Sequence, residues 1–174
     1  MELIQIMKNR RSIRKYTGDK IPRDKLNLIL QAGLLAPSSK NIRPVEFIVI
    51  EDKNILKKLS KSKKAGSGML SGASCAIVVI ADTRKADAWI EDCSLAMGYM
   101  LLMAESLGIA ACWVQERLRK TLLGKDSGTY VKELLEIPDY YEVEAILSLG
   151  IAKKVEEPRI WDETEQCKIH WENF

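Results

Sequence analysis

Residues 75–81 read CAIVVIA, a run of seven apolar residues without a polar position. A strand with one face in water alternates apolar and polar residues, whereas a strand covered on both faces reads as an unbroken apolar run. This run therefore predicts a central strand with helices on both faces of its sheet. The next segment, about residues 87–107, carries apolar residues on every side of a helical projection. It predicts a long helix that is buried all round.

The long helix has to be buried in a small protein. The chain has 174 residues and a mass of 19.7 kDa, which suits one domain over residues 1–174. One chain of that size offers too little surrounding surface to cover all sides of such a helix. We therefore expect a large homodimer interface around it.

Outward from this pair, apolar periodicity predicts three more strands and four more helices. Residues 45–50 (VEFIVI) predict a buried strand, and Asp52 and Ser127 are expected to cap the helices that follow them. The further strands are expected at residues 109–114 and 142–151, and the helices near residues 3–7, 22–34, 53–59 and 128–135, ahead of a polar, Trp-containing tail from residue 152. This order predicts an α+β fold.

Composition excludes several classes of protein. The net charge is +3, too small for a dedicated nucleic-acid binder. His170 is the one histidine. We therefore expect neither a zinc site with several His ligands nor a Ser or Cys nucleophile activated by His. No apolar run reaches the length of a membrane span, and we expect no membrane partner. The cysteines are scattered without a secretory signal, which predicts reduced thiols in a cytoplasmic protein. They are Cys75, Cys93, Cys112 and Cys167.

Two polar clusters could carry chemistry. Residues 10–14 read RRSIR and residues 36–44 read APSSKNIRP. Guanidinium groups beside a hydroxyl suit a phosphate or an anionic ring oxygen, although a solvated basic turn has the same composition. The second cluster by itself is an ordinary loop that leads into a strand.

Together and in this order, the clusters resemble the nitroreductase family of flavin enzymes. The likeness continues through residues 91–104, 107–115, 137–138 and 147–150. It implies a sandwich whose central mixed or antiparallel sheet is flanked by helices. It also implies an intertwined homodimer with FMN at two interface sites, and a tail, residues 152–174, that packs on the partner subunit.

The resemblance also implies roles for individual residues. Arg10 and Ser12 correspond to contacts with the flavin phosphate, and Arg14 to a contact with the pyrimidine edge of the ring. Arg11 is expected near the ribityl chain or the phosphate. A loop from the other subunit is expected to reach the same flavin. Its residues here are Pro37, Ser38, Ser39 and Asn41.

The strand after the long helix is expected to contribute mainly backbone. The family places a backbone amide against flavin N5, and Gln115 and Glu116 occupy that region here. Trp113 is expected to form a pocket wall, with Val114 beside it. A cation from the tail is also expected at the phosphate. The available groups are Lys153, Lys154 and Arg159, of which Arg159 best matches the family position.

Two departures from the family pattern leave alternatives open. Arg43 stands where the family often has Gln, and it either binds an anionic substrate group or pairs with Glu46. Some larger members place an Asn and a Lys at the pyrimidine edge of the flavin, and Lys63 and Lys64 are the candidate substitutes here.

The resemblance implies an FMN-dependent oxidoreductase that takes hydride from NADH or NADPH. By ping-pong chemistry it would pass electrons to a small-molecule acceptor of the nitroaromatic, quinone or enone type. The sequence leaves open which nicotinamide and which acceptor it uses. A flavin-binding sensor or carrier without turnover is the alternative. A nucleic-acid surface made by the lysines of residues 57–64 ranks last, because the net charge is low.

Overall fold

The centre of the fold is a four-stranded antiparallel sheet. A computed structural model describes residues 2–174. The strands are β1 (Val45–Ile50), β2 (Cys75–Asp82), β3 (Ala110–Gln115) and β4 (Tyr141–Gly150). They lie in the order β1-β2-β4-β3, and each neighbouring pair is antiparallel. The predicted α+β architecture is confirmed, with the antiparallel form of the sheet.

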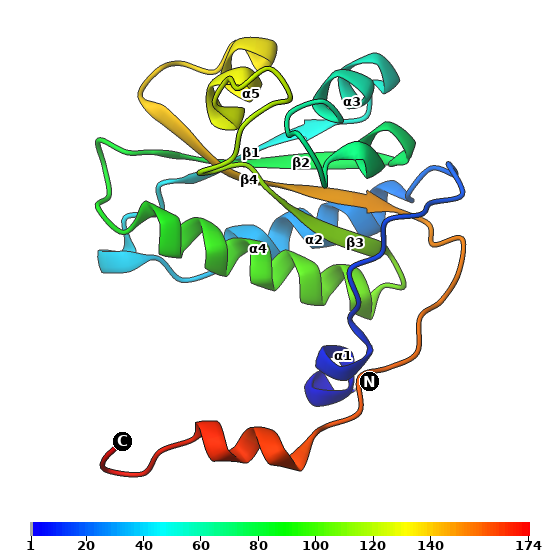
Figure 1. Cartoon of the computed structure of the whole chain (residues 1–174), viewed down its shortest axis with the longest axis vertical. Coiled ribbons are helices and arrows are strands. Elements are labelled where there is room, and N and C mark those ends of the chain that lie inside the picture. Colours follow the sequence, from blue (N-terminus) through cyan, green and yellow to red (C-terminus); the bar gives the residue numbers. More distant parts are fainter. Residues whose placement is uncertain (1) are drawn as a thin grey trace.

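Helices cover both faces of the sheet, as the run at residues 75–81 predicts. Helices α2 (Arg23–Leu34) and α4 (Trp89–Ser106) lie on one face, and α3 (Lys53–Leu59) and α5 (Ser127–Leu135) on the other (Figure 1). All eight residues of β2 are buried. Its side chains alternate between two cores: Ile77 packs in the cluster that contains Met97 of α4, and Val78 in the cluster that contains Leu56 of α3.

Two helix caps show how local chemistry sets element boundaries. Asp52 caps α3 as predicted, since its Oδ1 accepts the backbone N–H groups of Asn54 and Ile55 at 2.8 and 2.9 Å. The prediction that Ser127 caps α5 is wrong. Asp126 takes that place, accepting the Thr129 N–H at 2.8 Å, and the Ser127 hydroxyl donates to the Ser62 carbonyl at 2.7 Å instead.

The two edges of the sheet differ. The prediction that residues 45–50 form a buried strand is only partly right: β1 is an edge strand, and Ile50 is its one buried residue. At the other edge, the segment after α1 (Leu3–Asn9) runs beside β3. Its Ile13 N–H donates to the Ala111 carbonyl at 3.0 Å. The N-terminal connection therefore covers the first half of the β3 edge.

Helix α4 is the longest element of the fold. Its 18 residues span roughly 27 Å at 1.5 Å per residue. One face, which includes Cys93, Met97 and Met100, is fully buried against the sheet. The opposite stripe stays open in the single chain, with Leu95 and Tyr99 exposed by 41% and 40%. The single chain therefore does not bury α4 on all sides, and a partner subunit over the open stripe stays a prediction.

The tail leaves the body after β4. It carries a short 3₁₀ turn, Glu163–Lys168, and extends beyond α1 (Figure 1). Its large apolar side chains are exposed, among them Ile160, Trp171 and Phe174. Within residues 2–174, no helix is both long and apolar enough to cross a membrane.

Candidate functional site

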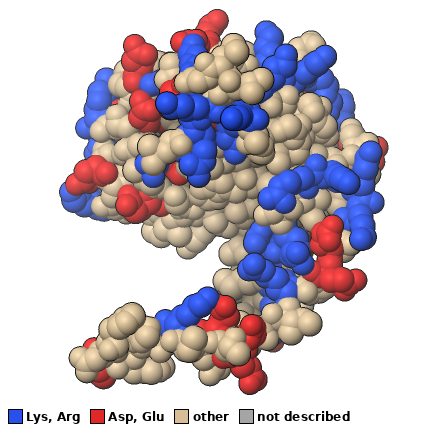
Figure 2. Space-filling view, in the orientation of Figure 1, with Lys and Arg blue, Asp and Glu red and all other residues tan. Residues whose placement is uncertain are grey.

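A cationic cleft lies where the N-terminal connection meets the start of the tail. Its volume is about 660 Å³. Seven of its ten lining residues are Arg or Lys, and one is Glu. Basic side chains gather at this part of the surface in Figure 2. The lining residues are Arg10, Arg11, Ser12, Ile13, Arg14, Lys15, Lys153, Lys154, Glu156 and Arg159.

Backbone pairing holds the two chain segments of the cleft together. The Thr17 N–H donates to the Ile151 carbonyl at 2.9 Å, and the Lys153 N–H donates to the Lys15 carbonyl at 3.0 Å. Farther out, the Arg159 N–H donates to the Lys8 carbonyl at 2.8 Å. Because these bonds use main-chain groups, most of the cationic side-chain ends remain for an anion. Guanidinium forks and a serine hydroxyl suit a phosphate dianion.

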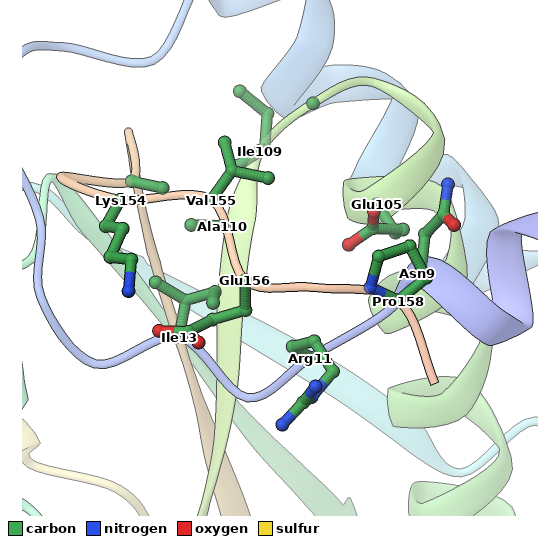
Figure 3. A pocket seen from close by; sticks show the side chains of 12 residues that line it. Asn9, Arg11, Ile13, Glu105, Ile109, Ala110, Lys154, Val155, Glu156 and Pro158 are labelled. Carbon is green, nitrogen blue, oxygen red and sulfur yellow. The ribbon is translucent and has the colours of Figure 1, made fainter. Parts of the chain in front are cut away.

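Arg11 joins this cleft to a narrower pocket. Its Nη1 donates to the Glu157 carbonyl of the tail at 2.7 Å. It also lines the second pocket, of about 240 Å³, between Glu105 and Val155 (Figure 3). Part of its donor capacity therefore anchors the tail. Arg14 Nη1 similarly donates to the Ser12 carbonyl at 3.1 Å.

The second sequence cluster does not join the cleft within one chain. The Ser39 N–H donates to Asp92 Oδ1 at 2.7 Å, which places the loop of residues 37–41 beside the first turns of α4. Arg10 acts at the other end of that helix, where burial raises the pKa of Glu105 and the Arg10 charge opposes this rise. Asp92 and Glu105 are about 20 Å apart along the helix axis. A single chain therefore keeps the two motifs separate.

The loop has an unusual backbone. Lys40, Asn41 and Arg43 have φ of 52°, 53° and 53°, a left-handed conformation that costs roughly 1 kcal/mol or more per non-glycine residue. The Ser38 hydroxyl accepts the Arg43 N–H at 2.8 Å, and the buried Asp92 carboxylate holds Ser39. These contacts offset the strain and fix the shape of the loop.

Arg43 does not form the ion pair with Glu46 that is one of its two expected roles. Its Nε donates to Asn41 Oδ1 at 3.0 Å. Glu46 accepts the Tyr141 hydroxyl at 2.5 Å, and no Arg43–Glu46 ion pair is present among residues 2–174. Arg43 therefore stabilises the loop conformation, and an additional role in substrate binding stays a prediction.

Strand β3 presents selected backbone groups at its open edge. The N–H and C=O groups of successive strand residues alternate in direction. The Ala111 carbonyl faces the N-terminal connection, whereas the Glu116 N–H donates to the Glu144 carbonyl of β4 at 3.1 Å. Gln115 lies four residues after Ala111, so its backbone groups point in the same direction as those of Ala111. The Gln115 N–H therefore points away from β4. Of the two amides predicted for this region, Gln115 supplies the open one.

The other predicted residues of β3 lie on either side of that strand. The Trp113 side chain is half-buried on the α4 face, and its Nε1–H donates to Gln115 Oε1 at 2.8 Å. Val114 is fully buried in the core beneath α3 and α5. The backbone groups of Val114 point toward β4, so Val114 contributes packing and no backbone donor at the open edge of β3.

The charges around Cys112 distinguish Lys63 from Lys64. Burial raises the pKa of the Cys112 thiol, and the positive charges of Arg14 and Lys63 oppose this rise. Lys63 thus lies near the same strand residue as Arg14. Lys64 donates its backbone N–H to the Lys120 carbonyl at 2.9 Å. Lys63 is therefore a further cation, with Arg14 and Arg10, whose charge acts on this part of β3.

Glu116 is a buried carboxyl that sequence reasoning treated only as backbone. Its side chain is completely buried, and Oε1 accepts the Ser62 hydroxyl at 2.9 Å. Burial raises its pKa from 4.5 to about 8, and the Ser62 hydrogen bond and the Lys63 charge oppose this shift. A pKa near 8 favours the protonated form of Glu116 at pH 7 in the folded protein.

This carboxyl makes stability depend on pH. Between about pH 4.5 and 8 the folded chain holds a proton on Glu116 that the unfolded chain releases, so stability falls as pH rises through this window. Glu116→Gln should remove that part of the slope and stabilise the protein at pH 9 by roughly 2 to 4 kcal/mol. Urea unfolding at pH 5, 7 and 9 checks this. Glu91→Gln, at an exposed position, is the control, and equal slopes for both variants would contradict the assignment.

Comparison with known proteins identifies relatives over nearly the whole chain. The nitroreductase family model matches residues 7–67 and 61–151. The structure of an FMN-dependent nitroreductase from Clostridium difficile R20291 is 43% identical, with a TM-score of 0.92, and the match covers 98% of this chain and 99% of that one. An Archaeoglobus fulgidus protein, provisionally named NADH dehydrogenase/NAD(P)H nitroreductase, is 38% identical over 87% of this chain and 86% of its own length.

A third similar protein was solved with a ligand. It is a Desulfovibrio desulfuricans protein, provisionally named a nitroreductase, in complex with FMN. It is 25% identical, has a TM-score of 0.79, and the match covers 100% of this chain and 98% of that one.

Within residues 2–174 of the present structure, no group of three or more His, Cys, Asp or Glu residues is placed to hold a metal ion.

Proposed function

The chain belongs to the nitroreductase family, and we propose that it is an FMN-dependent oxidoreductase that takes hydride from NADH or NADPH. The observation that carries this proposal is the cationic cleft beside β3. It combines a phosphate-binding group of residues with an open backbone donor on the neighbouring strand. FMN needs both kinds of group, one for its phosphate and one for its ring.

The residues of the cleft suit the phosphate of FMN. Arg10, Ser12 and Arg159 are the groups we assign to it, and Lys153 adds a further charge. Two or three charge-assisted hydrogen bonds from guanidinium and hydroxyl groups are a strong set for a phosphate dianion. Arg11 contributes by tying the tail to the cleft through Glu157.

The ring is expected to lie along β3. When bound, FMN supplies a ring that exchanges hydride at N5. Arg14 and Lys63 provide positive charge near Cys112, and such charge stabilises an anionic reduced ring. The Gln115 N–H supplies a fixed donor at the strand edge. The protein thus contributes orientation and electrostatics without a His or Cys nucleophile.

We propose that two copies of the chain complete each site. The loop of residues 37–41 is bonded to Asp92, whereas Arg10 lies near Glu105, about 20 Å farther along α4. Only a second copy of the chain can therefore bring this loop to the cofactor that Arg10 binds. The open stripe of α4 supplies an apolar surface for this contact. The exposed apolar residues of the tail, residues 152–174, are expected to pack on the partner in the same way.

We assign a ping-pong reaction to this site. Oxidised nicotinamide leaves before the second substrate binds, and the acceptor is a nitroaromatic, quinone or enone. Support comes from the single edge of β3 at which we place the flavin ring, because hydride enters and leaves the ring at the same atom, N5. Both substrates would therefore use the same face in turn.

An absorbance spectrum of the purified protein tests the proposed function. We expect flavin bands between about 300 and 550 nm, bleached under anaerobic conditions by NADH, by NADPH or by both. Admitting a quinone should then restore the bands without a nicotinamide present.

Two outcomes would count against the proposal. Bands that neither nicotinamide bleaches would favour the alternative, a flavin-binding sensor or carrier without turnover. Absence of bands even after incubation with FMN would remove the flavin assignment and leave residues 10–14 as a basic surface segment.

A further inference from the structure

We propose that Glu144 is a positioning residue, which holds the Gln115 amide in the direction needed at the flavin. This inference rests on the proposed function, because it assigns Gln115 as the donor beside the ring. It concerns a side chain on β4 that neither lines the cationic cleft nor belongs to a motif of the sequence. Four observations support it.

The first observation is a β-bulge. Val79 of β2 pairs with Ala145, but the next residue, Ile80, pairs with Val143. Glu144 is therefore an extra residue in β4 without a partner in β2. Bulges redirect side chains and are frequent beside active sites. Here the bulge occurs directly opposite the end of β3, where Gln115 pairs with Ala145.

The second observation is the set of bonds to the Glu144 carboxylate. Gln115 Nε2 donates to Oε1 at 2.9 Å, and Arg117 Nε donates to Oε2 at 3.0 Å. Trp113 Nε1 donates to the other end of the Gln115 amide at 2.8 Å. The Gln115 side chain is thus held from both sides, and its rotation about the backbone is restricted.

The third observation concerns the main chain. The Glu144 carbonyl accepts the N–H groups of both Glu116 and Arg117 at 3.1 Å. Gln115 Nε2 also lies 3.2 Å from this carbonyl. One residue therefore contacts the side chain of Gln115 and the backbone of the two residues after it. The direction of the Gln115 N–H is set by its place in β3, and the contacts of Glu144 hold the end of that strand and the Gln115 side chain in this arrangement.

The fourth observation is burial. The Glu144 side chain is 4% exposed, against 35% for its partner Arg117. A buried carboxylate is expensive to desolvate, and a well-packed apolar residue at such a position is often neutral or more stable. A carboxylate here, on the face of β4 toward α4, therefore points to a role beyond packing.

The test compares Glu144→Gln with Asp82→Asn. Both residues are buried carboxylates paired to an arginine, Asp82 with Arg84 at 2.8 Å. Asp82 lies on β2, one strand farther from β3 than Glu144, and its carboxylate is paired with Arg84 and Lys85. Glu144→Gln keeps the shape of the side chain and leaves Arg117 without its charged acceptor. We expect the limiting rate of flavin reduction by the nicotinamide to fall about 10-fold to 100-fold, with KM for the nicotinamide and FMN affinity changed less than about 3-fold.

A second readout needs neither FMN nor turnover. In the flavin-free protein, the ¹⁵N–¹H resonances of the Gln115 backbone and side-chain amides should move in Glu144→Gln and stay in place in Asp82→Asn. If Glu144→Gln does not fold, Arg117→Gln is used in its place. Arg117 is more exposed than Glu144, and this substitution removes one contact of the Glu144 carboxylate.

The outcomes separate this inference from the proposed function. Unmoved Gln115 resonances with a normal reduction rate in Glu144→Gln would overturn the positioning role while leaving the proposed function intact. An equal loss of rate in Asp82→Asn would also overturn it, since the loss would then reflect general destabilisation. Failure of the unmodified protein to oxidise a nicotinamide would instead refute the proposed function, and the resonances would still decide whether Glu144 orients Gln115.

Discussion

Arg10→Ala is expected to weaken FMN binding by about 1.5 to 3 kcal/mol, a factor of roughly 10 to 150 in Kd. Arg10 lines the cleft beside Ser12 and Arg159, and a charge-assisted hydrogen bond to phosphate accounts for a loss of this size. The affinity is measured by titrating the flavin-free protein with FMN and following the quenching of flavin fluorescence.

Arg23→Ala is the matched control for this experiment. It removes the same charge from the protein, but Arg23 begins α2 and pairs with Glu51 at 2.8 Å, outside the cleft. We expect its FMN affinity to match that of the unmodified protein at the same ionic strength. Equal affinities for Arg10→Ala and Arg23→Ala would show that Arg10 does not contact the phosphate.

Leu102→Asp is expected to convert a dimer into monomers. Leu102 lies on the same outer stripe of α4 as Leu95 and Tyr99 and is partly exposed. A carboxylate from each copy in an apolar interface must be desolvated without a partner, which costs several kcal/mol. Size-exclusion chromatography with light scattering should show the mass of one chain, near 19.7 kDa, and most of the bound flavin should be lost.

Ile55→Asp controls for the chemistry of this substitution. Ile55 lies on α3, across the sheet from α4, and is also partly exposed. We expect this variant to lose some stability and to remain dimeric with flavin bound. A dimeric, flavin-loaded Leu102→Asp protein would place the interface elsewhere than on α4.

The central elements of the fold could be predicted because their signals are local. An unbroken apolar run is sufficient to identify β2 as a strand covered on both faces, and the α4 pattern is long enough to be unambiguous. The burial of β1 could not be predicted, because it depends on the place of the strand in the sheet. The prediction that Ser127 caps α5 is wrong because Asp126 and Ser127 are adjacent and both residue types are good N-caps.

The candidate site divides in the same way. Residues 10–14 and the tail cations were predicted from motifs, and the structure does bring them into one cleft. The carboxylates of Asp92 and Glu144 were missed because their partners are distant in sequence: Asp92 bonds a residue 53 positions away, and Glu144 one 29 positions away. The same strand also contains Glu142, so a charged residue at position 144 is no local signal by itself.

The distance between the two motifs along α4 also bears on inheritance. In the proposed dimer, each site takes the Arg10 segment from one copy and the loop of residues 37–41 from the other. A copy damaged at Arg10 and a copy damaged at Ser39 can therefore assemble into a mixed dimer with one site lacking both groups and one site intact. Two alleles that are inactive alone would then complement each other within the same cell.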